Sequence, residues 1–187
     1  MTKDTAKNGA YSLRKKDPVR WVALAGFFMA LNIVFSSWGI PVPGGHLYLC
    51  DTVINIAAIL MDPLAAFIVG GLGSFLGDAI FYPAPMFVSL VTHGLQAVAV
   101  SLIAHRAGAS DTKSKQFRMS LIGVLVGAVI MVVGYTLGKI FVYSTLQYAI
   151  IKLPYEIAQA LLGVVGSLFL CFKAGILKIY RRMELNN

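Results

Sequence analysis

The side chains best suited to chemistry in this 187-residue sequence lie inside apolar segments and recur at helical spacing. Carboxylates, amides, imidazoles and phenols stand three or four residues apart there, so the members of each group share one face of a helix. The groups are Asp51 with Asn55, Asp78 with Tyr82, Ser89 with His93 and Gln96, Tyr135 with Lys139 and Tyr143, and Glu156 with Gln159. Such side chains hydrogen-bond a small polar ligand and stack on its rings, which indicates binding.

Motifs for catalysis and nucleotide binding are absent from the sequence. Gly138-Lys139 is followed by Ile140, so there is no P-loop, and G-x-S-x-G, H-E-x-x-H and paired haem-type histidines do not occur. Cys50 and Cys171 are the only cysteines and form neither a C-x-x-C motif nor a Cys/His cluster with metal-ligand spacing. We therefore expect a non-enzymatic protein without a cofactor or a metal site.

The composition is that of an integral membrane protein. The chain is 58% hydrophobic and 13% charged, whereas a soluble domain is about 45–50% apolar and about 25% charged. High apolar content with low charge also excludes a disordered chain. The net charge of +8 would indicate a nucleic-acid partner only if the basic residues formed one patch. They lie at the ends of apolar spans instead, so we expect a lipid bilayer as the environment and no nucleic-acid partner.

Apolar runs of about 20 residues predict an all-α integral membrane bundle of six transmembrane helices. The second span is short and can begin one turn earlier, near His46. We predict a basic cytoplasmic N-terminal tail at 1–19, a transmembrane domain at 20–179 and a cytoplasmic C-terminal tail at 180–187. The spans are expected at about 20–38, 49–61, 63–82, 85–105, 119–143 and 154–179.

The positions of lysine and arginine predict the orientation of the bundle. In the six-span arrangement, fourteen of the sixteen fall on one side, and only Lys139 and Lys152 fall toward the other. The positive-inside rule then places both termini in the cytoplasm. The outer loops become 39–48, the region around 82–85, and 144–153. The first outer loop contains His46 and Tyr48 in an apolar, aromatic stretch after Pro and Gly, and we expect it to pack over the bundle.

On this topology every polar group named above lies in the outer half of the membrane. Each residue also has a structural explanation. Asp51 can cap a helix, Asp78 can bond across packed helices, and Lys139 can reach the interface or pair with Glu156. His93 can be a satisfied interior histidine, and Tyr82 and Tyr143 can belong to an aromatic belt. Their shared depth favours a polar, aromatic-lined cavity that opens outward, because an ionisable residue at mid-membrane costs about 2.5–3.5 kcal/mol.

Small residues four apart predict close helix contacts. Gly73 with Gly77, Gly123 with Gly127, and Gly134 with Gly138 are expected to serve packing inside the bundle. Gly26 with Ala30 in the first span can equally dock another membrane subunit.

The stretch from Gly44 to His105 resembles the S components of energy-coupling factor (ECF) vitamin transporters, with the hydroxymethylpyrimidine, pyridoxine and riboflavin types as the nearest branch. It combines a Gly-rich outer loop that ends in Asp51, an Asp-Pro turn, and a Gly-rich span that ends in Asp78. A Pro-containing loop and a polar span follow, and LPYEIAQALLGVVG at 153–166 is similar to the start of the family's last helix. In the family's A-x-x-x-A signature of span 1, Gly26 replaces the first Ala here.

The resemblance implies a non-catalytic, multi-pass subunit in the plasma membrane of a prokaryote. Such a subunit captures a vitamin from outside and associates with a transmembrane scaffold subunit and two cytoplasmic ATPases. The family's site lies between the outer ends of the later helices and the first outer loop, and Gly26 and Ala30 correspond to its docking face. The expected substrate-binding residues are His46, Tyr48, Asp51, Asn55, Asp78, Tyr82, His93, Gln96, Tyr135, Lys139, Glu156 and Gln159.

Carboxylates, amides and tyrosines suit a small, flat, hydroxylated heteroaromatic ligand, and we favour hydroxymethylpyrimidine or a pyridoxine-type B6 vitamer. Riboflavin is an alternative, and Lys139 favours an acidic vitamin such as pantothenate unless Glu156 neutralises it. Two other classes remain open at this point. One is a non-transporting structural or assembly membrane protein, and the other is a membrane enzyme that uses His93 and an Asp.

Overall fold

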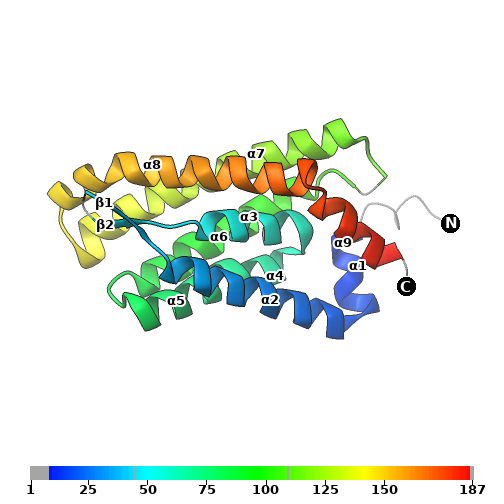
Figure 1. Cartoon of the computed structure of the whole chain (residues 1–187), viewed down its shortest axis with the longest axis horizontal. Coiled ribbons are helices and arrows are strands. Elements are labelled where there is room, and N and C mark those ends of the chain that lie inside the picture. Colours follow the sequence, from blue (N-terminus) through cyan, green and yellow to red (C-terminus); the bar gives the residue numbers. More distant parts are fainter. Residues whose placement is uncertain (1–8, 44, 109, 186–187) are drawn as a thin grey trace.

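The computed structural model describes residues 9–43, 45–108 and 110–185, and it is an elongated bundle of helices (Figure 1). The first eight residues of the predicted N-terminal tail and the last two of the C-terminal tail lie outside the described residues. Both described ends of the chain lie at one end of the bundle, beside α1 (Gly9–Lys16) and α9 (Ile176–Leu185). A short antiparallel hairpin of β1 (Ile40–Val42) and β2 (Gly45–Leu47) lies at the other end.

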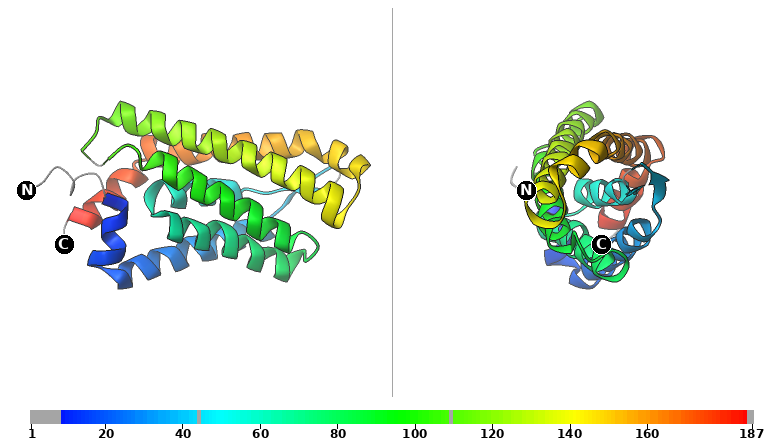
Figure 2. Two further views of the ribbon diagram at one scale, coloured as in Figure 1. Left: turned by 180° about the vertical axis from the view of Figure 1, so that it is seen from behind. Right: turned by 90° about the vertical axis from the view of Figure 1, so that its left-hand side faces the viewer.

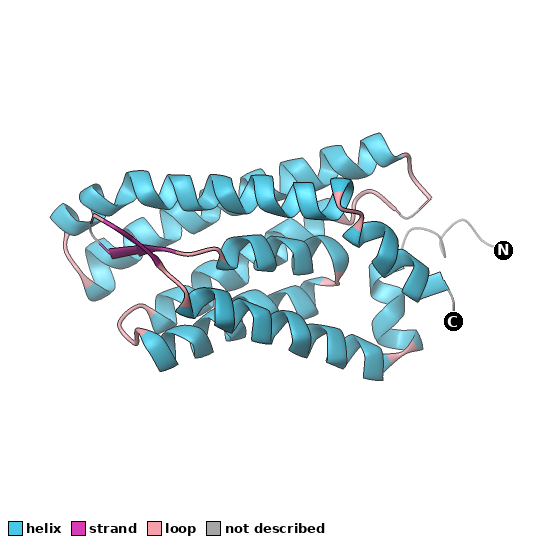
Figure 3. Cartoon of the chain, viewed as in Figure 1, coloured by secondary structure: helices cyan, strands magenta, loops and turns pink. Residues whose placement is uncertain are grey.

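Within the described residues, five helices are long and apolar enough to cross a membrane. Three of them include a π-helical segment, in which the backbone hydrogen bonds widen by one residue. It lies in the middle of one helix and at the end of the other two. The five are α2 (Pro18–Ser37), α4–η1–α5 (Pro63–Phe67, Ile68–Leu72 and Gly73–Phe81), α6 (Met86–Ala104), α7–η2 (Lys113–Gly138 and Lys139–Tyr143) and α8–η3 (Leu146–Leu168 and Phe169–Lys173). The chain is therefore an all-α membrane bundle, in which helices predominate (Figure 3).

The sixth apolar helix, α3 (Cys50–Leu60), is a short helix at the centre of the bundle. Ten of its eleven residues are buried, and Figure 2 shows it, in cyan, ringed by the other helices. At about 1.5 Å per residue it extends roughly half the hydrocarbon thickness. The hairpin precedes α3, and the short connection between β2 and α3 leads the chain from the hairpin end of the bundle to its centre. A helix enclosed by protein does not need to match the thickness of the lipid.

The last long helix begins earlier than the sequence predicts. The expected outer loop at 144–153 is nearly absent, because α8 starts at Leu146 and Pro154 lies inside it. The start is marked by Thr145, whose hydroxyl accepts a hydrogen bond from the Tyr148 N–H at 3.3 Å. Proline favours the first turn but is tolerated within membrane helices, so reading Pro154 as a helix start was wrong. The helix also ends earlier, at Lys173, and Gly175 with a positive φ of 84° separates it from α9.

Glycines bring the helices into close contact inside the bundle. A Cβ atom on Gly73 would lie 2.8 Å from Asn32 of α2, and one on Gly127 would lie 2.6 Å from Val100 of α6. The predicted internal use of these small residues is confirmed. Gly26 differs, because nothing lies within 4 Å of the position a Cβ would take, and Ala30 is likewise exposed.

Candidate functional site

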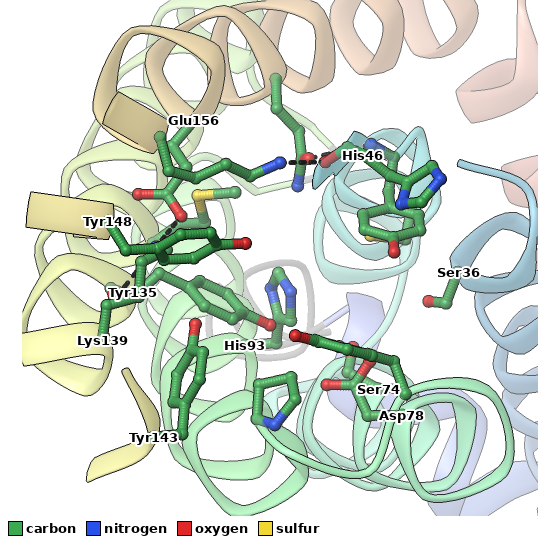
Figure 4. A pocket seen from close by; sticks show the side chains of 17 residues that line it. Ser36, His46, Ser74, Asp78, His93, Tyr135, Lys139, Tyr143, Tyr148 and Glu156 are labelled. Atoms are coloured by element: carbon green, nitrogen blue, oxygen red, sulfur yellow. Dashed lines mark hydrogen bonds and ion pairs between the residues drawn. The ribbon is translucent and has the colours of Figure 1, made fainter. Parts of the chain in front are cut away.

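A cavity of about 290 Å³ lies at the hairpin end of the bundle, lined by the hairpin-side parts of the long helices and by the chain leading into α3. Nine of the twelve predicted binding residues line it, namely His46, Tyr48, Asp78, Tyr82, His93, Tyr135, Lys139, Glu156 and Gln159. Figure 4 shows Tyr143, Tyr148 and Lys139 on one side, Ser36 and His46 on the other, and His93 between them. Most of the side chains that the sequence placed at one depth therefore converge on one space.

A lysine and a glutamate form an ion pair in the cavity wall. Lys139 Nζ donates to Glu156 Oε1 and also to the Tyr135 carbonyl, the latter at 3.2 Å. The same ammonium lies 5.5 Å from the centre of the Tyr135 ring, close enough for a cation–π contact. Both charged residues are buried. Glu156 therefore neutralises the charge of Lys139, so there is no longer a reason to expect an acidic ligand at that lysine.

Asp78 belongs to a chain of hydroxyl groups that crosses from α5 to α7. Ser89 of α6 donates to the Asp78 carboxylate, and the Tyr135 hydroxyl bonds to the Ser89 hydroxyl. Because Ser89 has a single proton to donate, the Tyr135 hydroxyl is the donor in the second bond. Asp78 thus bonds across packed helices and also lines the cavity. The two functions proposed for it from the sequence are compatible.

The loop between α2 and α3, which the sequence predicts as the first outer loop, is held over the cavity by two contacts from α8. Lys152 Nζ donates to the His46 carbonyl, and the Tyr48 N–H donates to Gln159 Oε1 at 2.9 Å. Burial, followed by the charge of Asp78, raises the pKa of the Tyr48 phenol above its ordinary value, so this group stays a neutral hydroxyl. His46 and Tyr48 therefore form a polar and aromatic roof.

Three predicted binding residues, Asp51, Asn55 and Gln96, do not line the cavity. They are buried behind it in a hydrogen-bonded layer. Gln96 Nε2 donates to Asp51 Oδ1 at 2.9 Å and to Asn55 Oδ1 at 3.4 Å. Asp51 does not cap its helix, because the cap position is Leu49 and the carboxylate accepts instead from Gln96 and Gln159. The helical face was predicted correctly, but an interior network takes up these side chains.

Several lining residues were not among the expected substrate-binding residues, although Tyr143 had been grouped with Tyr135 and Lys139. They are Ser36, Cys50, Ser74, Pro85, Met131, Tyr143, Tyr148 and Lys152. Lys152 stands four residues before Glu156, and Tyr148 stands four residues before Lys152, so all three share one face of α8. That signal was hidden because the region before Pro154 was taken as a loop.

One buried group has the composition of a metal site. The ligand atoms of Cys50, Asp51 and His93 lie within 4.8 Å of one another. Both Asp51 oxygens already accept amide hydrogen bonds, and His93 Nδ1 is bonded to Gln96 Oε1 at 2.7 Å. As arranged, these side chains serve a hydrogen-bond network rather than a coordination sphere.

Comparison with known proteins identifies the family. A sequence model of the family described as "ECF-type riboflavin transporter, S component" matches residues 16–176. The chain belongs to this family. An uncharacterized protein in gap 3'region of Pyrococcus woesei is 30% identical over 67% of this chain and 81% of its own length. A UPF0397 protein of Lactococcus lactis subsp. cremoris (strain NZ9000) is 26% identical over 70% of this chain and 75% of its own length.

Membership confirms the resemblance drawn from the sequence. An S component is the vitamin-binding subunit of a transporter. It is a multi-pass protein of a prokaryotic plasma membrane, in agreement with the five long apolar helices. The family also implies association with the ECF scaffold and ATPase subunits. Within this S component, the hairpin-end cavity is the candidate binding site.

Proposed function

We propose that this S component captures a hydroxymethylpyrimidine or a pyridoxine-type B6 vitamer in the hairpin-end cavity and delivers it with a scaffold subunit and two ATPases. The observation that carries the proposal is one enclosed space lined by tyrosines, two carboxylates and imidazole groups. Tyrosine rings stack on a flat heteroaromatic ring, and carboxylates accept hydrogen bonds from its amino or hydroxyl groups.

The size of the cavity favours a one-ring vitamin. Ligand pockets commonly measure about 300–1,000 Å³, and this one is near the lower end at about 290 Å³. Riboflavin is the second candidate, because the matching family is named for it, but its three fused rings and ribityl chain need more room. The pairing of Lys139 with Glu156 disfavours pantothenate, since the lysine's charge is already neutralised.

Mass spectrometry of small molecules released from freshly purified protein tests the proposal. We expect a pyrimidine or B6 vitamer in stoichiometric amount, and saturable binding of the same compound to the emptied protein by calorimetry. Asp78→Ala and Glu156→Ala should weaken binding at least about tenfold, as expected for a lost hydrogen bond to a charged group. Lys115→Ala is the matched control, because Lys115 lies in the first turn of α7 and pairs with Asp111 just before that helix. Neither residue lines the cavity. A folded protein that binds no vitamin would instead be the structural or assembly protein considered from the sequence.

We further propose that α2 docks the scaffold subunit through Gly26 and Ala30. Both residues are exposed and Gly26 has open space around it, as a close helix contact with a partner requires. Gly26→Trp should abolish uptake and leave vitamin binding unchanged. Gly77→Trp is the comparison, because a Cβ there would lie 3.1 Å from Ser36 inside the bundle, and this variant should lose its fold. Loss of binding in Gly26→Trp would show that α2 serves internal packing instead.

A further inference from the structure

We propose that a buried relay from Asp51 through Gln96 holds the His93 proton on Nδ1, so that His93 Nε2 accepts a hydrogen bond from the ligand. Together with a second free acceptor on Glu156, this selects a ligand that presents two hydrogen-bond donors. The inference rests on the proposed function for its ligand. The relay itself is a property of side chains that the structure describes.

The Asp51 carboxylate fixes the orientation of the side-chain amides of Gln96 and Gln159. Gln96 Nε2 lies 2.9 Å from Asp51 Oδ1, and Gln159 Nε2 lies 2.7 Å from Asp51 Oδ2. An ionised carboxylate only accepts hydrogen bonds, so each amide must present its NH₂ group to it. The reverse orientation would set a carbonyl oxygen against a carboxylate oxygen inside the protein, without water to separate them. Both amide oxygens therefore point away from Asp51.

The fixed orientation of Gln96 sets the tautomer of His93. Gln96 Oε1 faces His93 Nδ1 at 2.7 Å, and an amide oxygen only accepts, so Nδ1 carries the proton. In a neutral imidazole Nε2 then has a free lone pair. His93 is 2% exposed and lines the cavity, and no hydrogen bond within the described residues engages its Nε2. The inner end of the cavity therefore offers an acceptor.

Glu156 supplies the second acceptor. Its Oε1 is occupied by Lys139, whereas Oε2 is buried and has no hydrogen-bond partner within the described residues. The residue lines the same cavity, but Oε2 itself is not exposed to it, so the carboxylate has to rotate before a donor on a ligand can reach this oxygen. An unsatisfied buried carboxylate oxygen is unfavourable until a donor reaches it. Two acceptors in one cavity favour a neutral heteroaromatic with amino or hydroxyl groups, and they disfavour a ligand with a carboxylate at either position.

Nitrogen NMR of the ligand-free protein tests the relay without any vitamin. The chain has only three histidines, so the loss of one signal set in His93→Gln assigns His93 in ¹⁵N-histidine-labelled protein. At neutral pH we expect Nδ1 protonated and Nε2 bare. Asp51→Asn should produce a mixture of tautomers, because Asn presents both a donor and an acceptor to Gln96. Asn55→Ala is the matched control and should leave the tautomer unchanged, since it keeps the bond between Asp51 and Gln96.

Matched ligand pairs test the two acceptors. The probes are 4-amino-5-hydroxymethyl-2-methylpyrimidine with its 4-dimethylamino analogue, and pyridoxine with 4-pyridoxate, which carries a carboxylate in place of a hydroxymethyl group. For the vitamin that binds, we expect the partner lacking the donor to bind at least about tenfold more weakly, and Asp51→Asn to remove most of that difference.

The possible failures are distinguishable. A His93 that carries its proton on Nε2, or on both nitrogens, overturns the relay, as does an Asp51→Asn variant with an unchanged tautomer. Equal binding of the members of a pair overturns the assignment of the acceptors. Stoichiometric zinc in the purified protein, with Nε2 bound to it, makes His93 a metal ligand with Cys50 and Asp51 and overturns the proposal. A wild-type protein with the expected tautomer that binds none of the vitamins upholds the relay and overturns the proposed function.

Discussion

Lys139 and Glu156 show how a charged pair is kept inside a membrane bundle. Both side chains are almost fully buried, and each satisfies the other. A buried ion pair adds little net stability, because the cost of removing two charges from water offsets their attraction. Removing one partner is much more harmful, since the remaining charge is left without compensation. The pair therefore matters mainly for the arrangement of the cavity wall.

Replacing Lys139 with Met should lower the free energy of unfolding by about 3 kcal/mol, because Glu156 then keeps an unpaired charge. The double variant Lys139→Met/Glu156→Gln should recover most of this loss. Thermal unfolding in detergent, followed by tryptophan fluorescence, compares four proteins, namely the wild type, Lys139→Met, Glu156→Gln and the double variant. If the losses of the two single variants simply added in the double variant, the two residues would not be coupled.

Gln159 links the roof of the cavity to its buried layer, since it donates to Asp51 and accepts from the Tyr48 N–H. Gln159→Leu should release the loop and raise the dissociation rate of the bound vitamin about tenfold, as expected for the loss of about one hydrogen bond. Stopped-flow displacement measures this rate. Gln147→Leu on the same helix is the control, because Gln147 is exposed. An unchanged dissociation rate in Gln159→Leu would mean that the loop is held by other contacts.

At the scale of single residues, the sequence predicted which polar side chains share a helical face. It did not predict whether each one lines the cavity or belongs to the hydrogen-bonded layer behind it. Spacing and depth were enough to group Tyr135 with Lys139 and Glu156 with Gln159, because helical periodicity fixes which side chains share a face. Asp51 and Gln96 were assigned to the ligand, although they bond to each other behind the cavity. Hydrogen bonds between helices depend on packing distances that no spacing within one helix contains.

The helices themselves are positioned by glycines where they approach most closely. A Cβ atom on Gly163 of α8 would lie 2.6 Å from the Asp51 Cβ of α3, so these two helices meet at the residue that begins the relay. Backbone contact of this kind is the main attraction between helices in lipid. The position of Asp51 is thus set by the packing of α3 against α8.

Gly163→Leu should push α8 away from α3, lower stability by about 1–3 kcal/mol and abolish vitamin binding. Gly26→Leu introduces the same side chain where nothing lies within 4 Å of the Cβ position, and it should leave both properties unchanged. Melting temperature and calorimetric binding of the two purified variants provide the comparison. Equal effects of the two substitutions would contradict the packing argument.

The boundaries of elements were predictable where a proline or a polar cap coincides with the end of an apolar run. Asp62 before Pro63 is an example, since its carboxylate accepts from the N–H groups of Leu64 and Ala65 at 2.9 and 3.1 Å. Pro154 misled the prediction because a proline inside a membrane helix looks like a helix start. The hairpin was not predicted either, because strands of three residues carry too little periodicity.

The distribution of charge over the whole molecule separates its two ends. The described basic residues of the N-terminal region, of the segment from the end of α6 to the first turns of α7, and of the C-terminal region belong to the end where both termini lie. The cavity lies at the opposite end, where Lys139 and Lys152 are paired or hydrogen-bonded. By the positive-inside rule the cavity should face outward, as capture of a vitamin from outside requires.

Cysteine accessibility tests this orientation. In a Cys50→Ser/Cys171→Ala background, which removes both native thiols, single cysteines replace Ser144 between α7 and α8 and Ser114 at the start of α7, both of which are exposed. A membrane-impermeant maleimide added to intact cells should label Ser144→Cys, and Ser114→Cys should react only after the membrane is permeabilised. The reverse pattern would turn the cavity toward the cytoplasm, and an S component in that orientation has no access to an external vitamin.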